Sequence, residues 1–206
     1  MARLPIIRPA AVAAAFAIFA IGSAAAAEIE NWPCKFEYRD ALTPADVWEG
    51  TPPAAAGDWR QDEAVNKLVT FATEPENAPV SGREEITDFA KTLAPGPGKE
   101  RGIALALQGM VEQTNVLRHA VIAGIRDLRV KGVILGDAVK EDDAALAKLP
   151  DDADRERASI KAARHFNFRG KDDAEDGTDF MCHRLGYIEK KMHLLSDQLR
   201  IELNSK

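Results

Sequence analysis

The chain has 206 residues, a formal net charge of −6 and only 6% aromatic residues. An acidic chain lacks the clustered Lys and Arg with which proteins bind nucleic acid or anionic lipid, so the composition argues against both classes of partner. The length suits one domain with its own hydrophobic core.

The N-terminus has the layout of a bacterial secretory signal peptide. Arg3 and Arg8 precede an apolar stretch over residues 10–21, and the residues up to Ala27 fit the Ala-x-Ala rule for cleavage. A membrane anchor is the alternative, but the stretch is about a dozen residues long and spanning a bilayer takes about 20. We therefore expect residues 1–27 to be removed on export to a periplasm, with no stable membrane insertion afterwards. Removal leaves 25 basic residues against 33 acidic ones, a net charge of −8.

The chain has two cysteines, Cys34 and Cys182. In an oxidising compartment an even number usually pairs, and two cysteines allow one intramolecular pairing. That bridge would close a loop of about 148 residues and stabilise the fold by about 5 kcal/mol in the loop-entropy model. It would fasten the N-terminal segment to the last helix. A free reactive thiol or a metal-ligand role is the alternative.

Residues 28–98 are predicted to form short helices between loops. In "LTPADVW", Thr43 is a helix cap and Pro44 takes the first helical position, where its missing N–H does no harm. "DEAVNKLVTFAT" (62–73) is a helix that Pro75 and Pro79 end. The apolar positions on one face of this helix are Val65, Leu68, Val69 and Ala72.

"SGREEITDFAKTL" (81–93) is predicted to be a further helix. Ser81 and Glu84 have the spacing of a capping box, which would start the helix there. Its apolar face carries Ile86, Phe89 and Leu93. The sequence "APGPG" at 94–98 forces a break before the next element.

Residues 99–149 contain no proline and repeat apolar residues at steps of three and four, which predicts one long amphipathic helix or two joined end to end. Five glycines weaken this prediction, because each costs about 1 kcal/mol relative to alanine in a helix. The apolar face consists of Leu107, Met110, Val111, Thr114, Leu117, Val121, Ile125, Leu128, Leu135 and Val139.

Pro150 and the acids beside it predict a turn, followed by a second arm over 152–168. We expect "RGKDDAEDGT" (169–178) to interrupt this arm, and a final helix to run over 179–203. Met181, Leu185, Ile188, Met192, Leu195 and Leu199 form a strict heptad stripe along that helix. The predicted class is all-α: a long antiparallel helical hairpin (99–206) that carries the short helices of 28–98 in the same domain.

The sequence "FMCHRLGYIEKKMH" (180–193) gathers side chains that can bind metals. Met181 and Met192 fall in the heptad stripe, which favours a packing role. Folding the hairpin at residue 150 would put His119 opposite Cys182 and Met110 opposite Met192, so the alternative to packing is a soft-metal site across the two arms, of the type that suits copper. The candidate ligands are Met110, His119, His183, Met192 and His193.

Other cofactor and catalytic motifs are missing. The Cys-x-x-Cys-His pattern of c-type haem fails because residue 179 is Asp, and an EF-hand loop that starts at Asp172 lacks its acid at position 3 and its Glu at position 12. The acids at 141–143 and 151–154 resemble a solvated hairpin tip with weak divalent binding at most. No nucleophile elbow, phosphate loop or zinc-protease motif occurs, so we expect neither an enzyme nor a resident cofactor.

Three segments, "NWPC", "PADVWEG" and "FMCHRLGYIEKKM", resemble a group of secreted proteobacterial helical proteins. Members of that group begin with Trp-Pro-Cys, here Trp32-Pro33-Cys34, and carry a second cysteine in the last helix, here Cys182. "RGKDDAEDG" reads as an insertion relative to them. The group has no established activity, so the resemblance implies the Cys34–Cys182 pairing and export.

The sequence favours an exported, non-catalytic helical interaction or accessory protein of the periplasm. An envelope protein or a second copy of the chain would bind the exposed face of the long helices, or the region of Trp32, Trp48 and Trp59. Packing of these tryptophans against the hairpin is the other interpretation. The alternative function is a periplasmic metal-binding or metal-delivery protein that uses Met, His and Cys or acidic side chains.

Overall fold

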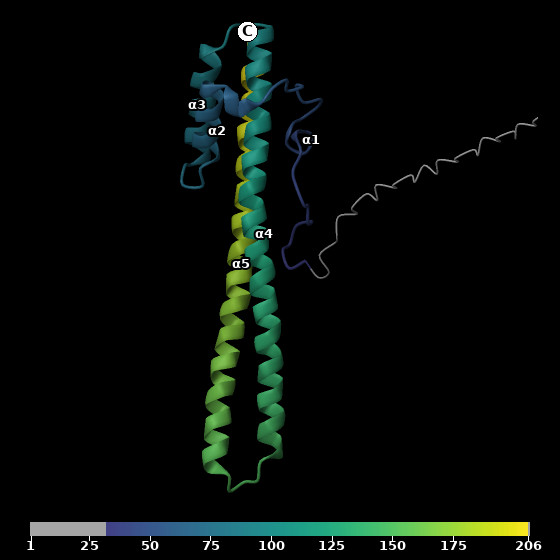
Figure 1. Cartoon of the computed structure of the whole chain (residues 1–206), viewed down its shortest axis with the longest axis vertical. Coiled ribbons are helices and arrows are strands. Elements are labelled where there is room, and N and C mark those ends of the chain that lie inside the picture. The colour runs from purple at the N-terminus through teal and green to yellow at the C-terminus, as the bar shows by residue number, and fades with distance from the viewer. Residues whose placement is uncertain (1–31, 206) are drawn as a thin grey trace, which may run out of the picture.

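The computed structural model describes residues 32–205 and confirms the all-α class for this part of the chain (Figure 1). The predicted signal segment, residues 1–27, lies outside the described residues. In chain order the elements are α1 (Pro44–Val47), the 3-10 helix η1 (Trp59–Gln61), α2 (Glu63–Thr73), α3 (Pro79–Thr92), α4 (Pro97–Lys148) and α5 (Asp154–Asn204).

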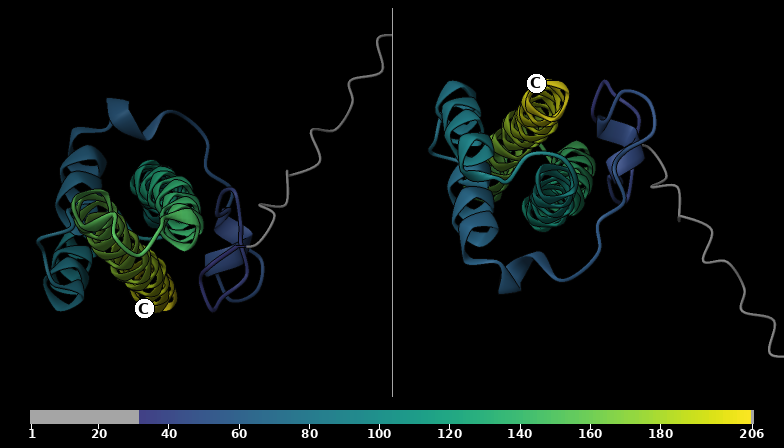
Figure 2. Two further views of the ribbon diagram at one scale, coloured as in Figure 1. Left: turned by 90° about the horizontal axis from the view of Figure 1, so that it is seen from below. Right: turned by 90° about the horizontal axis from the view of Figure 1, so that it is seen from above.

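The two longest helices, α4 and α5, form the predicted antiparallel hairpin. Helix α4 is one continuous helix of 52 residues, which settles the choice between one helix and two. The short helices α2 and α3 pack on one side of the hairpin and the N-terminal segment with α1 lies on the other (Figures 1 and 2). Both groups surround the half of the hairpin that contains the C-terminus, so the half near the turn at 149–153 extends beyond them as two helices alone. No helix within residues 32–205 has the length and hydropathy that a bilayer crossing requires.

The predicted interruption of the second arm at 169–178 is wrong, because α5 runs through it without a break. Gly170 and Gly177 lie where leucines of α4 press against α5. A Cβ at Gly170 would lie 3.0 Å from Leu135 Cδ1, and one at Gly177 would lie 3.2 Å from Leu128 Cδ1. The glycines therefore allow the helices to approach closely, and this packing offsets their low helix propensity.

Two predicted helix boundaries are also corrected. Thr43 and Pro44 do start α1, and the Thr43 backbone N–H donates to Asp46 Oδ2 at 2.7 Å. However, α3 begins at Pro79 and not at a Ser81 capping box. Pro79 therefore starts a helix, and α2 has already ended at Thr73.

Within residues 32–205 the core consists of two clusters. The larger one joins α2, α3 and the C-terminal half of α5 to the first third of α4, and it includes Met110 and Met192. The smaller one surrounds the disulfide and contains Cys34, Val121, Ile122, Ile125, Cys182, Leu185 and Ile188. Five residues of the predicted heptad stripe are buried and Met181 is half-buried, which confirms the stripe as the contact with α4.

The register of the hairpin differs from the predicted one by about one helical turn. Met192 Sδ accepts a hydrogen bond from Thr114 Oγ1 at 3.4 Å, whereas counting from residue 150 placed it opposite Met110. The register follows the apolar stripes that pack together, and the loop at 149–153 takes up the difference.

The predicted disulfide is confirmed, with Cys34 and Cys182 joined and their Cα atoms 5.4 Å apart. The interpretation of these cysteines as free thiols or metal ligands is therefore wrong. Both are buried, so the bridge fixes the N-terminal segment against the middle of α5.

Candidate interaction surface

The part of the hairpin that extends beyond the packed helices has no core of its own. We call residues 130–173 the distal arm and the rest of the described chain the head. No side chain in the distal arm is buried. Half-buried apolar side chains close the contact between its two helices, namely Leu135, Val139, Leu146, Leu149 and Ile160. At 1.5 Å per residue the arm extends about 30 Å from the head.

Polar pairs add to the contact within the distal arm. Arg164 Nε donates to Asp143 Oδ1 at 2.5 Å, and Asn167 Nδ2 donates to Asp142 Oδ2 at 2.9 Å. Exposed pairs of this kind stabilise a protein by about 0–1 kcal/mol each, because solvent screens them. The arm is therefore held by a narrow apolar line and weak polar contacts.

Helix α4 carries an exposed apolar patch on the distal arm. Val130, Val133 and Ile134 are 59%, 59% and 62% exposed, and we call these three residues the arm patch. They fall between the positions that face α5, so they point away from the partner helix. Charged residues of both signs border the patch, because Asp127 lies three residues before Val130, and Lys131 and Asp137 lie three residues before and after Ile134. Sequence reasoning missed this patch, although three β-branched residues off the predicted apolar face were a signal that could have revealed it.

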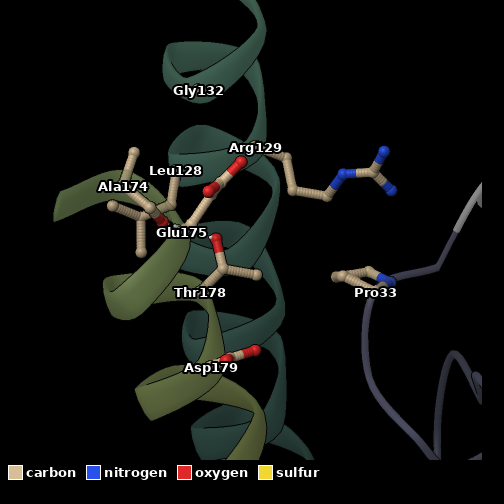
Figure 3. A pocket seen from close by; sticks show the side chains of 8 residues that line it. All are labelled: Pro33, Leu128, Arg129, Gly132, Ala174, Glu175, Thr178 and Asp179. Atoms are coloured by element: carbon tan, nitrogen blue, oxygen red, sulfur yellow. Dashed lines mark hydrogen bonds between the residues drawn. The ribbon is translucent and has the colours of Figure 1, made fainter. Parts of the chain in front are cut away.

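A cavity of about 300 Å³ lies where the distal arm meets the head (Figure 3). Arg129 extends from α4 toward the side of Pro33, while Glu175, Thr178 and Asp179 line the cavity from α5. Thr178 is already satisfied, because its hydroxyl donates to the Ala174 carbonyl at 2.8 Å. The volume is at the lower end of the range for ligand pockets.

The three candidate tryptophans pack within the head. Trp48 and Trp59 are 7% and 3% exposed and belong to the larger core cluster. Trp32 is half-buried, donates from Nε1 to the Phe36 carbonyl at 2.9 Å, and packs against Tyr38. These tryptophans offer a partner little accessible surface, which fits the interpretation that they pack against the hairpin.

The structure disperses the candidate metal ligands. Met110 and Met192 are buried in the core, and His119 Nε2 lies 3.1 Å from the Asp40 carbonyl oxygen. His183 and His193 are exposed on α5. Within residues 32–205, no three His, Cys, Asp or Glu side chains are close enough to share a metal ion.

Two buried cationic side chains form polar contacts between different segments of the head. Lys191 Nζ donates to the carbonyl oxygens of Glu74 and Asn77, at 2.6 and 2.8 Å, and so satisfies the backbone where α2 ends. Burial lowers the pKa of Lys191. Arg118 is 1% exposed and forms an ion pair with Glu189 at 2.8 Å.

Glu112 provides a pH-dependent contact between η1 and α4. Burial of its carboxyl raises the pKa, but hydrogen bonds from Trp59, Gln108 and Arg60, at 2.9, 3.0 and 2.8 Å, outweigh burial and hold the pKa below the usual 4.5. The unfolded chain therefore binds this proton at a higher pH than the folded chain does. The stabilisation is complete above pH 4.5 and is lost as the pH falls through the folded-state pKa.

We expect Glu112→Gln to lower the melting temperature more at pH 7 than at an acidic pH below the folded-state pKa of Glu112, where the wild-type carboxyl is itself protonated. Thermal unfolding at both pH values, followed by circular dichroism, measures the difference. Glu141→Gln, which changes an exposed carboxyl of the distal arm, is the matched control and should show no such contrast. An equal loss at both pH values would contradict the proposed role of the charge.

Comparison of the chain with family models, with curated proteins and with solved structures gives no match.

Proposed function

We propose that this chain is an exported helical interaction protein whose distal arm binds a protein partner in the bacterial envelope. The observation that carries the proposal is the arm patch: Val130, Val133 and Ile134 are exposed on an arm that the head does not cover. Contiguous exposed apolar side chains on a slender element favour contact with another protein.

Two features support export. The N-terminal sequence has the layout of a signal peptide, and the disulfide suits an oxidising compartment, where such bridges persist. The head would then serve as a rigid base, with the N-terminal segment fastened to α5 by Cys34–Cys182.

The chemistry of the patch suggests what the partner presents. Val130, Val133 and Ile134 offer branched apolar side chains, while Asp127, Lys131 and Asp137 border them with charges of both signs. A complementary surface would have an apolar centre and a rim with charges of both signs, since opposite charges at a rim guide association and orientation.

Site-specific photo-crosslinking in intact cells tests this function. A photoreactive phenylalanine analogue at Val133 should give a covalent adduct with a protein of the envelope fraction. The additional substitution Ile134→Asp should reduce the adduct yield at least about tenfold, because it places a charge in the apolar contact. The same analogue at Thr70, exposed on α2 in the head, is the matched control and should give no such adduct.

The chain isolated from the same cells should begin at Glu28, which N-terminal sequencing checks. Three results would contradict the proposal: adducts of equal yield at Val133 and Thr70, adducts that contain only this chain, or a chain that stays in the cytoplasm with residues 1–27 intact.

A further inference from the structure

Helix α5 carries a second apolar stripe, on a side that does not contact α4. Phe166, Phe180, Tyr187 and Ile201 are 74%, 66%, 46% and 52% exposed, and Leu194 between them is half-buried. These five residues lie in a series that repeats every seven positions, from 166 to 201. The sixth position of that series, residue 173, is an aspartate. We call this set of residues, 166 to 201 at steps of seven, the outer stripe.

The outer stripe keeps the same orientation relative to α4 along the whole of α5. The residues of α5 that face α4 also repeat every seven residues, so the outer stripe keeps a constant angle to them along the helix. Helix α4 covers one side of α5, α2 and α3 cover another, the N-terminal segment lies against α5 around Cys182, and the remaining outward side of α5 stays open (Figure 2). Beside the upper end of the stripe, α3 and α5 enclose a groove of about 550 Å³ that Val80 and Gln198 help to line.

A row of charged residues borders the outer stripe, each three positions after a member of the stripe. It reads Arg169, Asp176, His183, Lys190 and Asp197, and every one of these residues is exposed. The charges reverse about His183. Asp176 and Lys190 lie seven residues before and after it, and Arg169 and Asp197 lie fourteen residues before and after it.

We propose that two copies of this chain pair antiparallel along their outer stripes, with the twofold axis at His183. The axis would place Asp176 beside Lys190 of the second copy and Arg169 beside Asp197 of the second copy. A parallel pair would place each charged residue beside the same residue of the second copy, and two like charges repel each other. A foreign helix would not require this reversal, whereas a twofold interface must be complementary to itself.

The same axis aligns the apolar side chains. Phe180 meets Tyr187 of the second copy, and Phe166 meets Ile201 of the second copy, so the two most exposed aromatic residues are covered. The third pair sets Asp173 beside Leu194 of the second copy, so four of the six stripe positions form apolar contacts. Stripe residues 166–201 span about 54 Å at 1.5 Å per residue. Aromatic contacts supply most of the affinity in such interfaces, and the flanking ion pairs select the orientation.

Single-cysteine crosslinking of the purified chain lacking residues 1–27 tests the register. His183→Cys should form a disulfide with itself in the second copy under mild oxidation, because the axis passes through this position. Ala162→Cys, in the same row but 21 residues from the axis, is the matched control and should not, since the two copies of residue 162 would be about 63 Å apart. Because position 183 adjoins Cys182, peptide mapping without reductant must show that the crosslink joins residue 183 to residue 183 and that the Cys34–Cys182 bridge is intact.

Sedimentation of the same protein tests the charges. The wild type should be a dimer. Lys190→Asp should raise the dissociation constant about tenfold, because the new carboxylate faces Asp176 of the other copy in both symmetry-related contacts. The double exchange Asp176→Lys with Lys190→Asp restores opposite charges and should return the dissociation constant to within about threefold of wild type. All these residues are exposed, and circular dichroism should show unchanged helix content.

A chain that sediments as a monomer at every concentration overturns this inference. So does crosslinking at residue 162 as well as 183, which indicates a parallel pair, or crosslinking at neither position. Failure of the double exchange to restore the dimer also overturns it. The test uses purified protein alone, so its result is independent of whether the arm patch binds an envelope protein.

Discussion

Replacing both Cys34 and Cys182 with serine is expected to lower the free energy of unfolding by about 2–5 kcal/mol. The bridge spans a sequence separation of 148 residues, so it removes many conformations from the unfolded chain. In the folded chain it holds the N-terminal segment over Leu185 and Ile188. Without the bridge, the hydrogen bonds of Arg118 and Asn115 remain the principal polar contacts between this segment and the hairpin.

Urea unfolding of the double-serine variant, the oxidised wild type and the wild type in reductant measures this effect. The two chains without a bridge should agree with each other, which separates the covalent link from any effect of serine itself. Protease should cut the N-terminal segment of both faster than that of the oxidised chain. A loss below about 1 kcal/mol would show that the noncovalent contacts suffice to hold the segment.

Replacing Arg118 with methionine is expected to cost about 3 kcal/mol of stability. The guanidinium donates to Glu189 at 2.8 Å and to the backbone carbonyls of Arg39 and Asp40, at 2.7 and 3.2 Å. Methionine fills much of the volume but leaves these acceptors in a buried site without a donor, which is the costly part of the change.

Arg126→Met is the matched control for that substitution. Arg126 is exposed on the same helix and donates to the Tyr38 hydroxyl at 3.1 Å, so its loss should cost less than about 1 kcal/mol. Denaturant unfolding compares the two variants. Equal losses would contradict the assignment of Arg118 as the buried link between the N-terminal segment, α4 and α5.

The hairpin, the disulfide and the all-α class were predictable because each depends on a repeated or global feature. The heptad stripe of α5 identifies the side that packs on α4, and two cysteines allow one intramolecular pairing. By contrast, the supposed break at 169–178 rested on local composition. Glycine and acidic residues lower helix propensity, but propensity does not include the leucines of α4 that fill the space above Gly170 and Gly177.

Features that depend on packing between distant segments could not be predicted. Arg118 falls on the side of α4 that contacts the N-terminal segment, and its partners lie on a loop and on α5, which one helical pattern cannot relate. The register of the hairpin differed from the prediction for the same reason. The arm patch and the outer stripe were hidden because periodicity reports which residues share a side of a helix but not which side remains uncovered.

The absence of buried side chains between residues 130 and 173 gives the molecule unequal stiffness along its length. Separating the two helices at the loop end breaks a few half-buried contacts and solvent-screened ion pairs, while within the head the buried Arg118–Glu189 ion pair and the core clusters hold α4 and α5 together. The two helices can therefore separate locally at the loop end while the head stays folded. A protein that binds both helices there would stabilise the closed hairpin.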